Sequence, residues 1–202
     1  MFLMKRIALL VLFFVSYSIS FASEPEETIS PQEEKPGIIT GIEVLSGYGI
    51  SKVHEYSNYD LAPLIIDLNL DLKPAARKIN INYPGSLEFQ VETFVNTVVH
   101  PRANAEAGGA LNLKLGLVPD SWKFQPFALA GAGVVYMSQK TREQSTHFNF
   151  IEQVGLGGHY FISKKFGLTF ECRYRHLSNA GIKHPNKGIN TLFYLAGVSY
   201  QF

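Results

Sequence analysis

The sequence predicts an all-β fold, an eight-stranded antiparallel transmembrane β-barrel, from three observations. Apolar and polar residues alternate with a period of two along most of the chain after residue 37, eight segments carry this alternation, and one side of each segment is almost continuously apolar. Successive side chains of a strand point to opposite faces, so a period of two indicates strands. No comparable stretch alternates with the 3.6-residue period of a helix.

The first 37 residues precede the predicted barrel and divide into two parts. Residues 1–22 have a basic start, an apolar run from Ile7 to Val15 and small residues at the end, the pattern of a secretory signal peptide that is cut after Ala22. Residues 23–37 hold five glutamates and three prolines with almost nothing apolar. Such a segment buries too little surface to offset its ordering entropy, so we expect a flexible acidic tail. Residues 38–202 then form one domain.

The predicted strands are long. They cover residues 38–53, 61–73, 86–100, 103–118, 124–138, 146–163, 166–178 and 190–202. Strands of soluble proteins usually have about five or six residues, whereas a tilted strand that crosses a membrane needs about 9–11 residues. The lengths therefore favour a membrane barrel.

The polar side of these segments carries acids and bases together. Its charged members are Asp67, Asp71, Glu88, Glu92, Glu106, Lys114, Glu171 and Arg173. An apolar exterior around mutually paired polar side chains fits a barrel in lipid. Eight strands enclose an interior that side chains fill, which is too narrow for a porin channel. A soluble eight-stranded barrel of the lipocalin kind is the alternative fold.

Three further features indicate the bacterial outer membrane. Short turns at 100–102 and 163–165 alternate with longer polar loops at 56–60, 139–145 and 179–189, and aromatic residues gather at segment ends. The chain ends Tyr200-Gln201-Phe202, and a terminal aromatic residue that closes an alternating strand resembles the sorting signal of outer-membrane barrels. With both ends in the periplasm, the tail is periplasmic and residues 166–178 end at the cell surface.

Composition excludes other classes of function. The net charge of +1 argues against a nucleic-acid binder. The six histidines show no ligand spacing, so no metal site is indicated. Cys172 is the single cysteine and cannot form an intramolecular disulfide.

One pair of polar residues continues an apolar register. Leu168 to Tyr174 face lipid at even positions, and His176 and Ser178 follow at the same parity. Polar side chains on this face are costly, less so near the interface. At spacing i, i+2 an imidazole reaches a hydroxyl and can activate it for acyl transfer. Parity in the last strand places Asn190 beside His176, where it can orient the ring. An isolated H-x-S is by default only a polar strand end.

Residues 176–189 carry a family resemblance. His176-Leu177-Ser178-Asn179-Ala180-Gly181-Ile182-Lys183, followed by Pro185-Asn186 and Gly188-Ile189, resembles the signature of the outer-membrane lipid A 3-O-deacylases (PagL type). The resemblance implies cofactor-free hydrolysis of the 3-O-linked 3-hydroxyacyl chain of lipid A in the outer leaflet, with Ser178 as nucleophile and His176 as base. It also implies oxyanion stabilisation by Asn186 and by backbone N–H groups from Asn179 to Gly181.

This chain departs from the family pattern at one position, because the family has a glutamate where Asn190 stands. Asparagine can fix the tautomer of His176, but it brings no charge to stabilise an imidazolium. We also expect Lys183, Lys187 and Arg175 to meet the phosphates of lipopolysaccharide or to be solvated at the rim. The alternative function is a non-enzymatic structural or adhesive small barrel, and a homodimer is left open.

Overall fold

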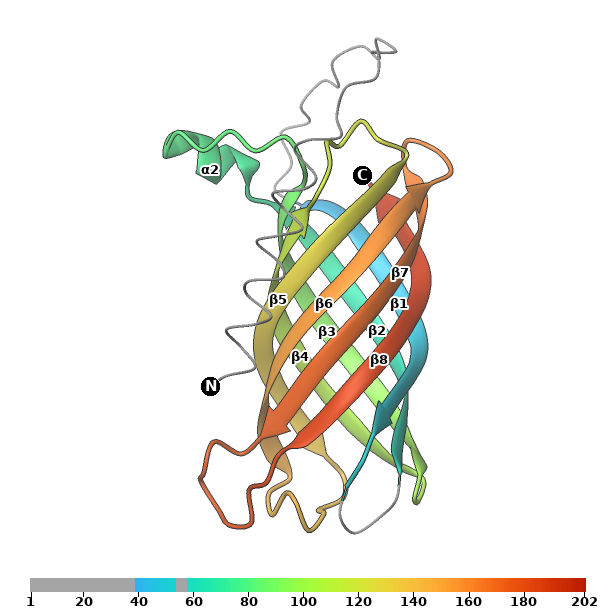
Figure 1. Ribbon diagram of the computed structural model, residues 1–202, viewed down its shortest axis with the longest axis vertical. Helices are drawn as coiled ribbons and strands as arrows, with labels where there is room; N and C mark the ends of the chain where they lie inside the picture. The colour runs from blue at the N-terminus through green and yellow to red at the C-terminus, as the bar shows by residue number, and fades with distance from the viewer. Residues whose placement is uncertain (1–38, 54–57) are drawn as a thin grey trace. The chain divides into compact units, whose positions relative to one another are not determined.

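The computed structural model describes residues 39–53 and 58–202, which form a closed barrel with the strands in sequence order (Figure 1). The strands are β1 (Ile39–Ser51), β2 (Tyr59–Asp71), β3 (Leu87–His100), β4 (Asn104–Gly116), β5 (Phe124–Met137), β6 (Phe148–Phe161), β7 (Phe166–Ser178) and β8 (Ile189–Gln201). Each neighbouring pair is antiparallel, and β1 pairs with β8 to close the barrel. The eight-stranded antiparallel barrel is therefore confirmed, with every predicted strand end within two residues of the observed one. The predicted signal peptide and tail lie outside the described residues.

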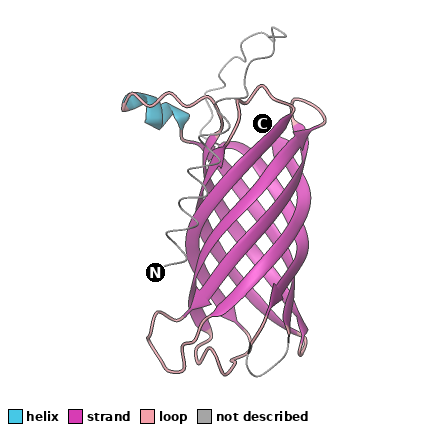
Figure 2. Ribbon diagram, in the orientation of Figure 1, coloured by secondary structure: helices cyan, strands magenta, loops and turns pink. Residues whose placement is uncertain are grey.

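The connections differ from the predicted alternation of short turns and long loops. The short turn after β3 lies at the same end of the barrel as the 179–188 loop, whereas the connection at 72–86, with helix α2 (Lys73–Lys78), lies at the other end (Figures 1 and 2). A proline in the first turn, two alanines and basic residues in the last turn favour this helix. Six residues are too few to show a helical period in the sequence. Within the described ranges, no helix is long and apolar enough to cross a bilayer.

The two faces of the barrel wall have opposite chemistry. The outward face exposes large apolar side chains such as Leu64, Leu111 and Phe170, each more than half exposed. Inside, Arg173 pairs with Glu92 and with Glu171, at 2.5 Å in each case. A charge taken out of water needs such a partner, and an apolar surface of this extent is stable only against lipid.

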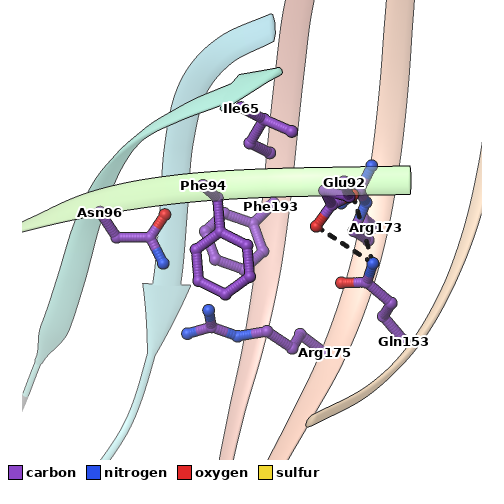
Figure 3. A pocket seen from close by; sticks show the side chains of 8 residues that line it. All are labelled: Ile65, Glu92, Phe94, Asn96, Gln153, Arg173, Arg175 and Phe193. Carbon is purple, nitrogen blue, oxygen red and sulfur yellow. Dashed lines mark hydrogen bonds and ion pairs between the residues drawn. The ribbon is translucent and has the colours of Figure 1, made fainter. Parts of the chain in front are cut away.

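Side chains fill the interior. Lys114 pairs with Glu43, and Gln153 donates to Asn112 at 2.8 Å. A cavity of about 10 Å³ remains among the eight residues drawn in Figure 3. That is room for about one water molecule. The packing agrees with the expected narrow barrel, and the chemistry of the protein must be sought on its outside.

An apolar cluster of interior side chains fixes the register of β7 and β8. Leu177 and Ile189 are paired across these strands and fully buried inside the barrel. Because alternate residues point to opposite faces, the neighbours of Leu177 must point outward. A slip of one residue would reverse every side chain and bury polar groups in this cluster.

Candidate active site

His176, Ser178 and Asn190 share one patch on the outer face of the barrel. His176 and Ser178 are half-buried, Asn190 is exposed, and the Cα of Asn190 is paired with that of His176 across β7 and β8. The structure thus brings together the three residues that parity alone assigned to one face. They lie at the end of β7 that carries the loop at 179–188 (Figure 1).

Asn190 is hydrogen-bonded to the Nδ1 atom of the His176 imidazole. The Nδ1 atom of His176 lies 2.6 Å from Oδ1 of Asn190. A carbonyl oxygen accepts, so Nδ1 carries the proton and Nε2 is left with a lone pair. In this tautomer Nε2 can accept a proton, as a general base must.

Ser178 is near this base without a hydrogen bond to it. Both side chains line an open pocket of about 300 Å³, together with Phe150 and Ala180. Among the described residues, no hydrogen bond joins the Ser178 hydroxyl to His176. Catalytic hydrogen bonds are often long before substrate binds and tighten in the complex. The placement of Ser178 and His176 in one pocket is therefore compatible with a nucleophile and its base.

Gly188 makes room for the imidazole ring. A Cβ atom at this position would lie 2.5 Å from Cε1 and 3.2 Å from Nε2 of His176. The backbone of Gly188 also has a φ of +76°, a left-handed conformation that glycine adopts without strain. The absence of a side chain at Gly188 therefore lets the loop backbone pass close to the imidazole of His176.

The side-chain amide of Asn186 is held in one orientation. Its Oδ1 accepts from the backbone N–H of Asn179 at 2.9 Å and from Nε2 of Gln144 at 3.0 Å. A backbone N–H only donates, so the atom that faces it must be the oxygen. The Nδ2 of Asn186 makes no hydrogen bond within the described part of the chain, which leaves this donor for a ligand.

Two backbone N–H groups of the loop next to Ser178 are already engaged. The N–H of Asn179 donates to Asn186, and the N–H of Gly181 donates to Oδ1 of Asn179 at 3.0 Å. Asn179 also donates from Nδ2 to the carbonyl oxygen of Lys183 at 2.7 Å. Asn179 and Gly181 therefore shape the loop in this structure, and the N–H of Ala180, on the rim of the pocket, is the donor between them that no described group accepts.

The basic residues near the site separate into two groups. Lys183 and Lys187 are exposed in the loop. Arg175, in contrast, points into the barrel, where it donates to Glu106 at 2.8 Å and stacks near Phe193. The expectation that Arg175 meets a phosphate outside the barrel is wrong, because its odd position puts it on the interior face.

Sequence reasoning missed two residues of this region. Gln144 is fully buried between the loops after β5 and β7, and nothing in its local sequence indicates the contact with Asn186. Glu152 lines the same pocket as Ser178. Its signal was present, since it interrupts an otherwise apolar outward register on β6. In the described part of the chain, no group of three or more histidine, cysteine or acidic side chains is placed to hold a metal ion.

Comparisons with known proteins agree with this architecture. The model of the family described as lipid A 3-O-deacylase (PagL) matches residues 71–199. The crystal structure of the outer membrane enzyme PagL is similar at 16% identity and a TM-score of 0.59, covering 79% of this chain and 99% of that one. Neisserial surface protein A (NspA) is similar at 14% identity and a TM-score of 0.58, covering 81% and 97%. These two likenesses support the fold alone, and no curated protein matches in sequence.

Proposed function

The chain belongs to the lipid A 3-O-deacylase (PagL) family, and from this premise we propose that it hydrolyses the ester-linked 3-hydroxyacyl chain at the 3-position of lipid A in the bacterial outer membrane. One observation carries the proposal. A tautomer-fixed histidine and a serine lie side by side on the lipid-facing surface, where polar side chains are otherwise disfavoured. A lipid substrate can reach such a site from within the membrane.

Ser178 and His176 divide the chemistry. His176 takes the hydroxyl proton at Nε2 while the Ser178 oxygen attacks the ester carbonyl carbon. The bond from this carbon to the sugar oxygen breaks, the sugar oxygen takes the proton from the imidazolium, and an acyl-serine forms. Water then attacks the acyl-serine, giving one proton to His176 and releasing the 3-hydroxy fatty acid. The proton returns to Ser178, so the free enzyme is regenerated without a cofactor.

Asn186 is the donor best prepared for the oxyanion. Its oxygen is occupied by two N–H groups, so Nδ2 is presented without a rearrangement of the side chain. A preorganised donor costs no reorganisation when charge develops on the carbonyl oxygen. The N–H of Ala180, a residue that lines the pocket of Ser178 and His176, is the second donor of the proposal.

The orientation of the barrel follows from the chemistry of the substrate. The site lies at the barrel end opposite α2 and the C-terminus. If this end faces the outside of the cell, the site meets the outer leaflet, where lipopolysaccharide resides. Lys183 and Lys187 are then exposed where its phosphates lie, as charge-assisted contacts.

Mass spectrometry of lipid A tests the function directly. Lipid A is isolated from cells that express the parent protein, the Ser178→Ala variant, or neither. We expect the loss of one 3-hydroxyacyl mass only with the parent protein. An unchanged spectrum, with the parent protein folded in the outer membrane, would favour the structural or adhesive barrel instead.

A further inference from the structure

Glu152 is an exception on the outer wall of the barrel. Along the described strands, the outward-facing positions carry mostly apolar, small or uncharged polar side chains, and Glu152 and Asp60 are the acidic residues at outward parity. Asp60, at the start of β2, has His100 as a partner at 3.2 Å, whereas Glu152 is exposed. On β6 its outward neighbours are Phe150 and Val154. A carboxylate on a lipid-facing surface needs a compensating role, although its cost falls toward the interface.

The position of Glu152 is defined by its partner on β7. Its Cα is paired directly with that of His176, so His176 stands between Glu152 on β6 and Asn190 on β8. Cβ atoms of directly opposed residues lie about 4.5–5.5 Å apart, within reach of a glutamate side chain. Glu152 also lines the pocket that Ser178 and His176 share.

Glu152 brings a negative charge to His176, which the neutral Asn190 does not. Asn190 orients the imidazole but is neutral, whereas the proposed reaction makes His176 an imidazolium each time Ser178 gives up its proton. A nearby carboxylate favours that charged form, and more strongly where little water surrounds it. Within the described residues the two side chains form no ion pair, so the proposed interaction is electrostatic and not a direct contact in this structure.

We propose that Glu152 is a second positioning residue for His176. Asn190 orients the imidazole ring, and the negative charge of Glu152 stabilises the imidazolium that forms during the reaction. This inference rests on the proposed Ser178–His176 chemistry. The other groups that face His176 do not provide a charge: Tyr174 precedes it on β7, β8 presents Leu192 besides Asn190, and the loop presents Gly188. A role in binding phosphate is disfavoured, because a carboxylate repels an anion.

The test compares Glu152→Gln, Glu152→Asp and the double variant Glu152→Gln/Asn190→Glu with the parent protein. Two readouts are taken across pH: release of 3-hydroxy fatty acid from lipid A micelles, and the rate at which a fluorophosphonate probe labels Ser178. For Glu152→Gln we expect kcat about tenfold lower with KM within about twofold, and the acid limb of both profiles at lower pH. Glu152→Asp retains most activity, and the Asn190→Glu change restores it by placing a carboxylate on the other side of the ring.

Thr93→Val is the control, since it alters an outward-facing polar residue on β3 and should change neither profile. An acid limb that stays in place in Glu152→Gln, or a loss that appears in KM alone, would overturn the inference. If the parent labels at Ser178 with an acid limb that depends on Glu152 but releases no fatty acid from lipid A, the inference stands and the proposed substrate is wrong. If the parent neither labels nor hydrolyses, both proposals are wrong.

Discussion

The Oδ1 atom of Asn190 lies 2.6 Å from the Nδ1 atom of His176, and the two residues are paired across β7 and β8 on the outside of the barrel. This contact sets the tautomer of the histidine with an uncharged group. It leaves Nε2 as a proton acceptor on a surface that otherwise faces lipid.

Ser178→Ala and His176→Ala are expected to lower kcat at least about 10³-fold each, because the nucleophile and its base act as a unit. Both side chains point away from the interior, so the heat-modifiable gel mobility of the barrel should persist. Deacylation of lipid A micelles measures the effect. Ser46→Ala, an outward-facing serine on β1, is the control and should keep full activity. Activity of either site variant within tenfold of the parent would place the chemistry elsewhere.

Asn190→Glu is expected to retain activity and to move the acid limb of the pH–rate profile to higher pH. A carboxylate favours the protonated imidazole, so a higher pH is needed to keep His176 neutral as base. Asn190→Leu should lose activity, yet less completely than His176→Ala, since nucleophile and base survive with poorer orientation. The measurement is the pH–rate profile of each variant. An acid limb that does not move in Asn190→Glu would show that position 190 does not act on His176.

Gly188→Ala is expected to lower kcat by about tenfold or more, because the new methyl group would lie 2.5 Å from Cε1 of His176 and displace the ring. Gly181→Ala is the matched comparison. Gly181 also has a positive φ, of +80°, but a Cβ there meets nothing within 4 Å. Both variants carry backbone strain of about 1 kcal/mol. Equal losses of activity in the two would assign the effect to strain and not to the contact with the imidazole.

Gln144→Leu is expected to lower kcat by about tenfold with little change in KM, because Asn186 then loses one of the two donors that hold its oxygen. The direct change Asn186→Ala should cost more, about 10²-fold, as for removal of an oxyanion donor. Steady-state kinetics on lipid A micelles separate kcat from KM. A Gln144→Leu variant with normal kcat would mean that Asn179 alone suffices to orient the amide.

Arg173→Ala is expected to destabilise the barrel by about 3–5 kcal/mol, because Glu92 and Glu171 keep their buried charges but lose the cation that pairs with them. Urea unfolding of the protein in lipid vesicles measures this change. Lys164→Ala, in the exposed turn between β6 and β7, is the control and should leave the unfolding midpoint in place. A midpoint for Arg173→Ala equal to the parent's would show that the interior network contributes little to stability.

The sequence by itself determined the barrel, its strands and the face of each strand residue. Alternation is a local property of the chain, so parity alone put His176, Ser178 and Asn190 outside and Arg173 inside. The same logic, applied consistently, would have excluded Arg175 from the surface and singled out Glu152 on β6. The short helix at Lys73–Lys78 and the placement of the turn after β3 were not predictable, because a few loop residues carry no periodic signal.

Only the tertiary structure decided what the loops do. The contact of Gln144 with Asn186 joins residues 42 apart in the chain, and the room that Gly188 leaves for His176 depends on the path of the loop back to β8. The pairing of Glu152 with His176 depends on the register of β6 against β7, which is set by interior packing and hydrogen bonding along both strands. Alternation fixes the side of the wall on which a residue stands. The residues that lie beside it on the adjacent strands are fixed only when the strands pair and the barrel closes.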